Sequence, residues 1–195
     1  LMTFFREEHE IFRKSVTAFL EKEVAPHVEE WEKAELFPRE LFKKCGELGF
    51  FASHYPEDVG GNGGKDGDWW YSAVWGESMV SARCAGVAMA LMVQSDMATP
   101  IINELGTREQ KEEFLIPALR GEKIAALGVS EPGAGSDVAS IRTTARRDGG
   151  DYVINGAKCW ITNGTRADFI TLAVRTGAEN SGFGGISLIT FPTDV

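Results

Sequence analysis

The sequence predicts an α+β protein, in which an all-α N-terminal domain is followed by a domain of antiparallel strands. Two observations lead to this prediction. Over residues 1–121, apolar side chains recur at three- and four-residue steps and glycines follow the periodic runs, as expected for helices. From residue 122 on, short runs rich in Val, Ile, Thr and aromatic residues are separated by turn signals, which is typical of strands. We therefore expect two domains, residues 1–121 and 122–195, the second incomplete at its C-terminal end.

The helices of the first domain are predicted one after another along the chain. The first has an apolar face made by residues at helical spacing, namely Phe12, Val16, Phe19, Leu20 and Val24. Pro26 is expected to kink or restart this helix. Further helices are expected over residues 39–48, 68–80, 83–93 and 98–105. The last begins at Thr107, where Thr107 and Gln110 form a capping box, and ends near Leu119 before Gly121.

Five extended runs are predicted in the second domain. They cover residues 124–130, 140–148, 151–161, 168–175 and 185–191. Asp148-Gly-Gly-Asp151 separates two of these runs and is a strong signal for a β-hairpin. We expect the strands to be antiparallel.

Composition and charge limit the function classes. The chain has 195 residues, of which 43% are hydrophobic and 25% charged, and a formal net charge of −9. An acidic protein lacks the positive field that attracts nucleic acid, so no nucleic-acid partner is expected. Three cysteines at spacings that match no metal motif indicate reduced thiols. No apolar run approaches membrane-spanning length and no signal peptide is recognisable. We therefore expect a cytoplasmic protein or, after cleavage of a targeting segment, one of the mitochondrial matrix.

The segment from Ala125 to Asp137 is the most informative part of the sequence. A run of small and apolar residues leads into Ser130-Glu131, Pro132 turns the chain, and Gly133-Ala-Gly-Ser136 follows with little side-chain bulk. Such a segment brings backbone N–H groups and small hydroxyls close to a flat or phosphorylated ligand. The alternative is a strand followed by an ordinary Pro-Gly turn. The segment is neither a dinucleotide fingerprint nor a phosphate loop, because the required third glycine and the Gly-Lys-Ser/Thr sequence are missing.

A second segment, Asn155-Gly-Ala-Lys-Cys-Trp-Ile-Thr-Asn-Gly164, begins about twenty residues later. It places an aromatic ring, a hydroxyl and a tight Asn-Gly turn at the end of a predicted strand. Trp160 alone would be interpreted as a core residue of that strand. Together, however, the two segments closely resemble the flavin-binding signatures of the acyl-CoA dehydrogenase family. The resemblance implies that the indole of Trp160 packs against an isoalloxazine ring, to which Thr162 can hydrogen-bond.

The resemblance to the acyl-CoA dehydrogenase family covers essentially the whole chain. It is supported by Pro56-Glu-Asp-Val-Gly-Gly61, by the region of Glu77 and Arg83, and by Gly106-Thr-Arg-Glu-Gln-Lys111. It implies a helical N-terminal domain, a middle domain that is an antiparallel β-barrel and, beyond this sequence, a C-terminal helical bundle. This order agrees with the change of character near residue 122.

The resemblance also implies a cofactor and a substrate. FAD would contact seven residues of the two signatures: Leu127, Val129, Ser130, Ser136, Trp160, Ile161 and Thr162. Ser136 would also lie near the substrate, an acyl-CoA thioester. In the implied α,β-dehydrogenation a carboxylate removes the α-proton, the β-hydride passes to the flavin, and the electrons leave to an electron-transfer flavoprotein. Fixed donors must polarise the thioester carbonyl, and the pocket must exclude water.

The catalytic base is not among these residues. In the family it is a glutamate of the C-terminal bundle, so we assign no catalytic residue and expect the base C-terminal to Val195. The chain alone is expected to be an inactive fragment of a longer enzyme that forms a homo-oligomer, a dimer or a tetramer. Glu131 and Asp137 could act as acid or base, but local pairing of Glu131 and capping of a turn by Asp137 explain them equally well.

Two polar segments have both a functional and a structural interpretation. The loop Gly60–Gly64 could cradle a phosphate, although such loops are more often mobile surface connections. Asn180 and Ser181 could meet a nucleotide, although a plain solvent loop is the simpler interpretation.

Several residues of the predicted helices are also ambiguous. Gln94 and Ser95 could line a cavity, but core hydrogen bonding explains them better. Arg83 is interpreted as a structural partner, for example of Glu77, rather than as a ligand clamp. Three methionines could line an adaptable acyl pocket or simply pack within helices: Met89, Met92 and Met97.

Other functions remain open at this point. A flavin-dependent acyl-CoA oxidase or monooxygenase of the same superfamily differs in how the reduced flavin meets oxygen. A non-catalytic module that binds acyl-CoA or flavin would result if no base-bearing domain exists. A helical interaction protein would leave the two joint signatures unexplained.

Overall fold

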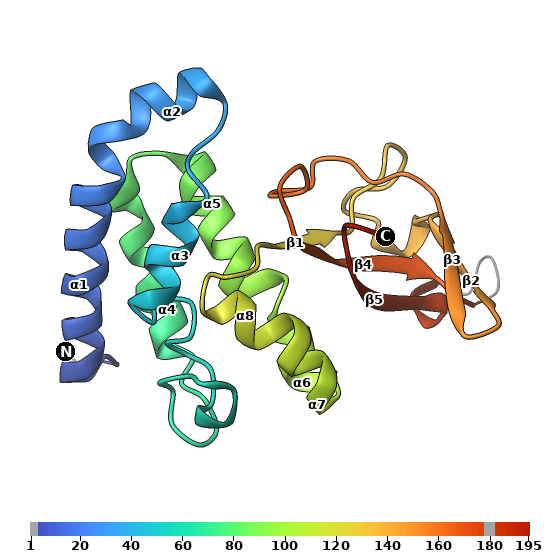
Figure 1. Cartoon of the computed structure of the whole chain (residues 1–195), viewed down its shortest axis with the longest axis horizontal. Coiled ribbons are helices and arrows are strands. Elements are labelled where there is room, and N and C mark those ends of the chain that lie inside the picture. Colours follow the sequence, from blue (N-terminus) through green and yellow to red (C-terminus); the bar gives the residue numbers. More distant parts are fainter. Residues whose placement is uncertain (1–3, 178–181) are drawn as a thin grey trace. The chain divides into compact units, whose positions relative to one another are not determined.

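A computed structural model describes residues 4–177 and 182–195 (Figure 1). Helices occupy the first part of the described chain and strands the second, which confirms the predicted α+β class. The chain divides into two compact units, Leu1–Lys123 and Ile124–Val195.

The helices of the first unit follow the predicted order. The α-helices are α1 Glu7–Glu23, α2 Val28–Ala34, α3 Glu40–Glu47, α4 Trp70–Ser78, α5 Ala85–Met92, α6 Pro100–Leu105, α7 Arg108–Gln110 and α8 Ile116–Leu119. Short 3₁₀ turns connect them, namely η1 Ala25–His27, η2 Glu57–Val59 and η3 Met79–Ala82. Two π-helical segments extend them, η4 Val93–Met97 and η5 Lys111–Leu115.

Local signals set the ends of these helices, as the sequence predicts. Pro26 lies in η1, between α1 and α2. The Thr107 hydroxyl accepts a hydrogen bond from Gln110 N (3.3 Å), and the Gln110 side chain accepts one from Thr107 N (2.9 Å), which confirms the capping box. Gly121 follows α8 with a φ of 70°, and a Cβ there would lie 2.1 Å from the carbonyl oxygen of Phe42. Glycine is therefore required where this helix ends.

Aromatic side chains form much of the core of the first unit. Phe42, Phe51 and Trp75 are almost completely buried. Their rings lie 6.2 Å apart for Phe42 and Phe51 and 6.1 Å apart for Phe51 and Trp75, measured between centroids. Each such side chain stabilises the fold by about 1.5–3 kcal/mol through the apolar surface it removes from water.

The π-helical segment η4 contributes buried hydrogen bonds to this core. The Gln94 side chain donates to the carbonyl oxygens of Ala118 (2.9 Å) and Lys123 (2.7 Å). The Tyr55 hydroxyl donates to the carbonyl oxygen of Ser95 (2.6 Å). Core hydrogen bonding is thus confirmed as the role of Gln94, and Ser95 is buried with it.

One helical run of the first unit is long and apolar enough to cross a membrane by length and composition. Residues Ala85–Leu105 contain an 18-residue window with a mean hydropathy of 1.3, half of which is buried inside the protein. The expectation that no run reaches this length was therefore wrong. Because the run includes the buried polar side chains Gln94 and Ser95, a core helix explains its composition.

The strands of the second unit form one mixed sheet. Their bounds are β1 Ala125–Gly128, β2 Thr144–Asp148, β3 Asp151–Asn155, β4 Phe169–Arg175 and β5 Ile186–Pro192. β5 pairs antiparallel with the whole of β4, from Phe169↔Pro192 to Arg175↔Ile186. β2 and β3 form the predicted hairpin, in which Asp148 pairs with Asp151 and Gly149 has a φ of 60°.

The expectation of a purely antiparallel sheet was wrong for two pairs. β1 runs parallel to β4, with Ala125 opposite Phe169, and β2 also runs parallel to β4, with Thr144 opposite Arg175. Both strands lie along the same edge of β4, one after the other, because the segment between them continues forward instead of reversing. Turn signals report only reversals between strands that are neighbours in sequence, so this arrangement was not predictable from them.

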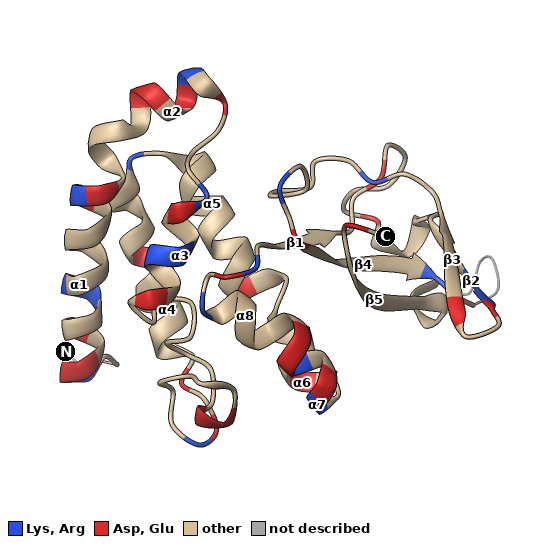
Figure 2. Cartoon of the chain, viewed as in Figure 1, with Lys and Arg blue, Asp and Glu red and all other residues tan. Residues whose placement is uncertain are grey.

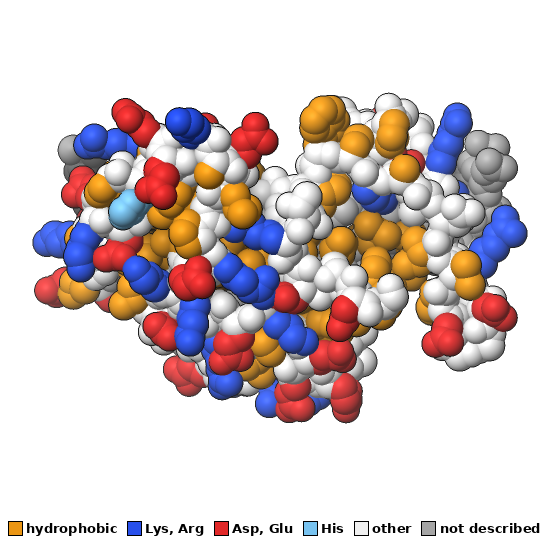
Figure 3. Space-filling model, turned by 45° about the horizontal axis from the view of Figure 1, so that its top comes forward, with side chains coloured by type: hydrophobic (Ala, Val, Ile, Leu, Met, Phe, Trp, Pro, Cys, Tyr) orange, Lys and Arg blue, Asp and Glu red, His pale blue; other side chains and the backbone are white. Residues whose placement is uncertain are grey.

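β4 is the central strand and packs on both faces. Ala173 belongs to one apolar cluster with Ala134 and Ile141, whereas Leu172 and Val174 belong to a second on the opposite face. The side chains around the second cluster are only partly buried, namely Ile154, Ile170, Ile189 and Phe191. Apolar side chains are accordingly visible at the surface of this unit (Figure 3). The strand is buried on both sides, which explains its almost continuously apolar sequence.

Candidate functional site

The two signature segments lie side by side in the second unit. The Lys158 ammonium donates to the carbonyl oxygen of Val129 (2.9 Å) and to Oε1 of Glu131 (2.8 Å). The backbone N–H of Cys159 donates to the carbonyl oxygen of Ser130 (3.0 Å). We call the ion pair between Glu131 and Lys158 the clasp, because it joins segments that are 27 residues apart in sequence.

The clasp is buried, and both of its side chains make further hydrogen bonds. The side chains of Glu131 and Lys158 are only 7% and 8% exposed. Glu131 also accepts hydrogen bonds from the backbone N–H groups of Arg142 (2.7 Å) and Thr143 (2.9 Å). Burial alone would raise the pKa of Glu131, but Lys158 and these N–H donors outweigh it and lower the pKa to about 2. Local pairing therefore explains Glu131, and an ionised carboxylate held in this way is a poor general base.

The turn after Glu131 is tight, and its glycines face open space. Glu131 and Ala134 exchange backbone hydrogen bonds of 2.8 and 3.1 Å across Pro132 and Gly133. Neither Gly133 nor Gly135 has a left-handed φ, and a Cβ added at either would meet no atom within 4 Å. The described chain thus has no conformational or packing need for glycine at these positions. The close approach of a ligand remains a reason for them.

Trp160 was expected at the end of a strand, but β3 ends at Asn155 and Trp160 lies in the loop that follows. Its side chain is 92% exposed and its φ is 60°. An exposed indole cannot be a core residue, so that alternative is excluded. Left-handed backbone is unfavourable for a bulky residue, and such strained positions cluster at binding sites.

The loop that carries Trp160 is held on both sides. Before Trp160, Lys158 and Cys159 contact the first segment, as described above. After it, the buried side chain of Asn163 donates to the carbonyl oxygen of Ala125 in β1 (3.2 Å), and Gly164 N donates to Ile161 O (2.9 Å). The indole is therefore presented to solvent by an anchored loop.

The seven predicted FAD ligands all lie on these two segments. Leu127, Val129, Ser130, Ile161 and Thr162 are half-buried, whereas Ser136 and Trp160 are exposed. Within the part of the chain that the structure describes, the hydroxyls of Ser130, Ser136 and Thr162 make no hydrogen bond. These hydroxyls, the open turn and the exposed indole are the donor set and flat surface that a flavin nucleotide needs. The assignment of each residue as a FAD ligand stays a prediction.

Sequence reasoning missed the residues that hold the site together. Lys158 was noted only as part of the second segment, and Asn163 only as part of a turn. The one available signal was the presence of two acids in the first segment, Glu131 and Asp137, and of a single lysine in the second. Their pairing could not be predicted without knowing that β1 and the loop after β3 meet.

The loop Gly60–Gly64 does not have the geometry of a phosphate cradle. Four successive amides donate to carbonyl oxygens of the protein, which are those of Glu57, Pro56, Ala52 and Tyr55 for residues 60 to 63. Few amides are left to bind an anion. Asn180 and Ser181 lie outside the described residues.

The remaining candidates have structural contacts or none. Glu77 pairs with Arg13 (2.6 Å) and not with Arg83, so the suggested partnership was wrong. Asp137 precedes the 3₁₀ turn η6 Val138–Ser140, and its carboxylate accepts from the Ser140 hydroxyl. The methionines are not simply buried, since Met89 is 44% and Met97 38% exposed. Among the described residues, no group of three His, Cys, Asp or Glu side chains could hold a metal ion.

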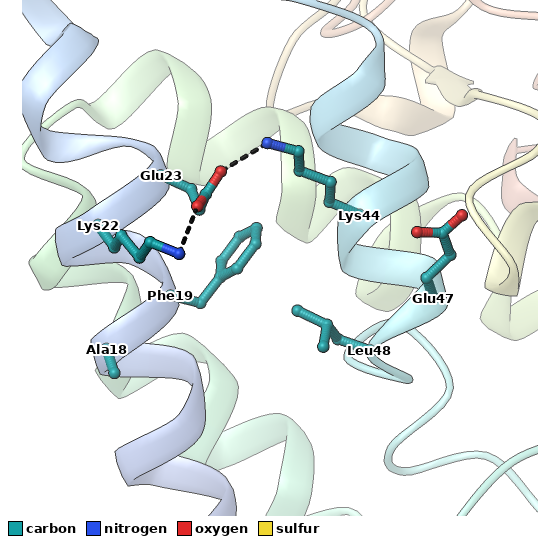
Figure 4. Close-up of a pocket in the computed structure, with 7 residues that line it drawn as sticks. All are labelled: Ala18, Phe19, Lys22, Glu23, Lys44, Glu47 and Leu48. Atoms are coloured by element: carbon teal, nitrogen blue, oxygen red, sulfur yellow. Dashed lines mark hydrogen bonds and ion pairs between the residues drawn. The ribbon is translucent and has the colours of Figure 1, made fainter.

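A hollow of about 430 Å³ lies between α1 and α3 in the first unit (Figure 4). Phe19 and Leu48 face each other across it, and Lys44 and Lys22 both contact Glu23, at 2.5 and 3.3 Å. Hydrogen bonds from Lys44 and then Lys22 lower the pKa of the Glu23 carboxyl. None of the predicted site residues lines the hollow, and its Glu23 carboxylate is already paired with Lys44 and Lys22. The hollow is therefore not the candidate site.

Comparisons with known proteins show which family models and relatives the chain resembles. The family model described as "Acyl-CoA dehydrogenase, N-terminal domain" matches residues 6–122, and "Acyl-CoA dehydrogenase, middle domain" matches residues 126–195. The long-chain specific acyl-CoA dehydrogenase of Rattus norvegicus mitochondria is 42% identical over 185 residues, which are 94% of this chain and 42% of that protein.

Solved structures show the same similarity. An acyl-CoA dehydrogenase of Geobacillus kaustophilus superposes with a TM-score of 0.89 at 40% identity, covering 100% of this chain and 50% of the other. A glutaryl-CoA dehydrogenase of Mycobacterium smegmatis in complex with FADH2 gives a TM-score of 0.83 at 30% identity, covering 97% and 46%. The chain therefore spans half or less of the length of these relatives.

Proposed function

The chain belongs to the acyl-CoA dehydrogenase family, and on this premise we propose that it is the N-terminal and middle part of a FAD-dependent enzyme. The proposed reaction is α,β-dehydrogenation of an acyl-CoA thioester. One observation carries the proposal: the clasp brings the two signature segments together beside an open glycine turn and an exposed indole.

The residues of the site fit a flavin nucleotide. Gly133 and Gly135 leave room for close approach, and the hydroxyls of Ser130, Ser136 and Thr162 are available as hydrogen-bonding groups. The anchored Trp160 offers a flat apolar surface. A bound FAD would supply the hydride acceptor, and this chain would supply its binding surface. Ser136, in the same turn, is proposed to face the acyl-CoA as well.

The residues of this chain are proposed to bind and position FAD and the substrate, and none of them is proposed as the catalytic base. Glu131 is held ionised by three hydrogen bonds, and Asp137 accepts a hydrogen bond from Ser140. We therefore propose that the catalytic base belongs to residues outside this sequence. We expect the chain alone to bind FAD and acyl-CoA without converting the substrate. An electron-transfer flavoprotein as electron acceptor, a dimeric or tetrameric assembly and a cytoplasmic or mitochondrial location remain proposals that rest on the family.

A second candidate follows from the same observation. Because neither Glu131 nor Asp137 is free, a chain without a base-bearing partner would be a non-catalytic module that binds flavin and acyl-CoA. An acyl-CoA oxidase would use the same surface and differ only in how fast oxygen reoxidises its flavin.

Visible absorption spectra test these proposals. We expect the purified protein to take up FAD and the flavin band to be bleached by an acyl-CoA when the base-bearing part is present. FAD uptake without bleaching would favour the binding module, and rapid recovery of the band in air would favour the oxidase. Absence of FAD uptake by the protein in its full length would contradict the proposed function.

A further inference from the structure

A second cavity in the β unit carries positive charge. It has a volume of about 400 Å³ and lies along β2 and the end of β4. Its lining residues are Ile141, Arg142, Thr144, Ala145, Arg146, Arg175, Thr176 and Gly177. Three of these eight residues are arginines and none is acidic, in a protein whose net charge is −9. We propose that this cavity binds a phosphate group of a nucleotide ligand.

Two of the arginines present free guanidinium groups. Arg142 and Arg146 are exposed, and neither forms an ion pair with a carboxylate of the described residues. Figure 2 colours the Lys and Arg positions along the chain blue, including those in the strands of this unit. Thr144 and Arg146 are two residues apart on β2, so their side chains project from the same face of the strand. The guanidinium groups of Arg142 and Arg146 therefore add positive charge to the cavity that no carboxylate of the described residues neutralises.

The third arginine is fixed in place. Arg175 is 7% exposed and donates to the carbonyl oxygens of Ala139 (2.7 Å), Ile141 (3.2 Å) and Gly182 (3.3 Å). These bonds hold η6 and the 3₁₀ turn η7 Gly182–Gly185 against the end of β4. Arg175 thus forms part of the cavity wall. Its hydrogen bonds hold its positive charge in one position.

The hydrogen-bonding groups around the cavity suit a phosphate. One guanidinium group can bind two oxygens of a phosphate at the same time, through strong charge-assisted hydrogen bonds. Thr176 adds a hydroxyl, which lies 2.6 Å from that of Ser187, and Thr144 adds a second. A volume near 400 Å³ accommodates a phosphorylated ribose or a diphosphate, whereas an apolar acyl chain would leave the arginines unsatisfied.

The inference deepens the proposed function and rests on it for the identity of the ligand. Both ligands of that function contain phosphates: CoA carries a diphosphate and a 3′-phosphate, and FAD carries a diphosphate between its flavin and its adenosine. The phosphate chemistry is common to both, and the two sources are separated by experiment.

Calorimetric titrations of the full chain provide the test. Wild type and the variants Arg142→Gln and Arg146→Gln are titrated with CoA and pantetheine, and with FAD and riboflavin. Pantetheine and riboflavin lack phosphate groups. We expect each substitution to weaken binding of one phosphate-bearing ligand about tenfold and to leave its phosphate-free counterpart unchanged. A loss confined to CoA assigns the cavity to the acyl-CoA, and a loss confined to FAD assigns it to the cofactor.

Arg147→Gln is the matched control, because Arg147 lies on the same strand but does not line the cavity. If Arg147→Gln weakens ligand binding as much as the cavity variants do, the effect comes from the general electrostatic field of the protein and the proposal is overturned. Unchanged binding of both CoA and FAD in the two cavity variants would also overturn it. If wild type binds neither CoA nor FAD, the proposed function fails and inorganic phosphate becomes the probe. Phosphate binding that is lost in Arg142→Gln and Arg146→Gln then supports the site, and its absence from wild type overturns it. Melting temperatures confirm that each variant is folded.

Discussion

Two glycine-rich segments of this chain look alike in sequence and differ in what their glycines do. In the loop Gly60–Gly64 the amides of residues 60 to 63 are bonded to the protein's own carbonyls, and a Cβ at Gly61 would lie 2.0 Å from the carbonyl oxygen of Tyr55. In the turn Gly133–Gly135 no atom lies within 4 Å of either added Cβ. The first loop needs glycine to fold. The second leaves space that the described chain does not use, which is the pattern expected beside a ligand.

The largest expected effect comes from breaking the clasp that holds the open turn against the loop of Trp160. Lys158→Met leaves the buried Glu131 carboxylate without its partner, which typically costs about 3–5 kcal/mol. Denaturant unfolding of the full chain, followed by circular dichroism, measures this loss. Lys44→Met is the matched control, because its pair with Glu23 lies at the surface and should contribute at most about 1 kcal/mol. Equal losses in the two variants would show that the clasp is an ordinary surface pair.

Gly61→Ala tests the first half of the comparison. The added Cβ would overlap the Tyr55 carbonyl, so we expect a loss of stability of about 3 kcal/mol from forced backbone shifts. FAD affinity, measured per folded molecule, should stay at the wild-type value. A variant as stable as wild type would mean that this loop is not constrained by its packing.

Acid should weaken the clasp without any mutation. The pKa of Glu131 is lowered from 4.5 to about 2, so its stabilising contribution is present above pH 4.5 and is lost as the pH falls towards 2. We expect the stability difference between wild type and Glu131→Gln to be constant above pH 4.5 and to shrink below it. Melting temperatures at a series of pH values measure this difference. A difference that stays constant down to pH 2 would contradict the assignment.

Trp160→Ala sharpens the comparison at the open turn. The indole is 92% exposed, so its removal should change the free energy of unfolding by no more than about 0.5 kcal/mol. Loss of a stacking surface should weaken FAD binding about tenfold. Tyr152→Ala, at another exposed aromatic of the same unit, should leave FAD binding unchanged. A large loss of stability with unaltered FAD affinity would count against the placement of Trp160 in the site.

Gly135→Ala is expected to have the smallest effect. Its Cβ meets nothing in the protein, so the melting temperature should stay within about 2 °C of wild type. FAD binding should weaken by less than tenfold, because a methyl group intrudes on a surface that the ligand approaches closely. If FAD affinity is unchanged in both Gly133→Ala and Gly135→Ala, the open space beside these glycines is not evidence for a bound ligand.

The helical unit was largely predictable because its signals are local. The capping box at Thr107 and the restart at Pro26 depend on residues within one helical turn, and the end of α8 is marked by the glycine that follows it, Gly121. The β unit was predictable only strand by strand. The parallel pairing of β1 and β2 with β4 depends on crossovers that leave no local signal.

The site was predicted in its segments but not in its construction. The two signatures identify the residues from Leu127 to Ser136 and from Trp160 to Thr162 by their resemblance to a family. The clasp, the left-handed conformation of Trp160 and the anchor at Asn163 depend on contacts between segments distant in sequence. No periodicity or spacing reports such contacts, so only the folded chain reveals them.

Hydrogen–deuterium exchange of the full chain, with and without FAD, tests the central claim most directly. The account predicts that FAD slows amide exchange in residues 127–136 and in residues 158–164, because the clasp joins these two segments into one binding surface. It predicts no change in residues 60–63, whose amides are already bonded within the protein. Protection of residues 60–63, or of only one of the two signature segments, would contradict it.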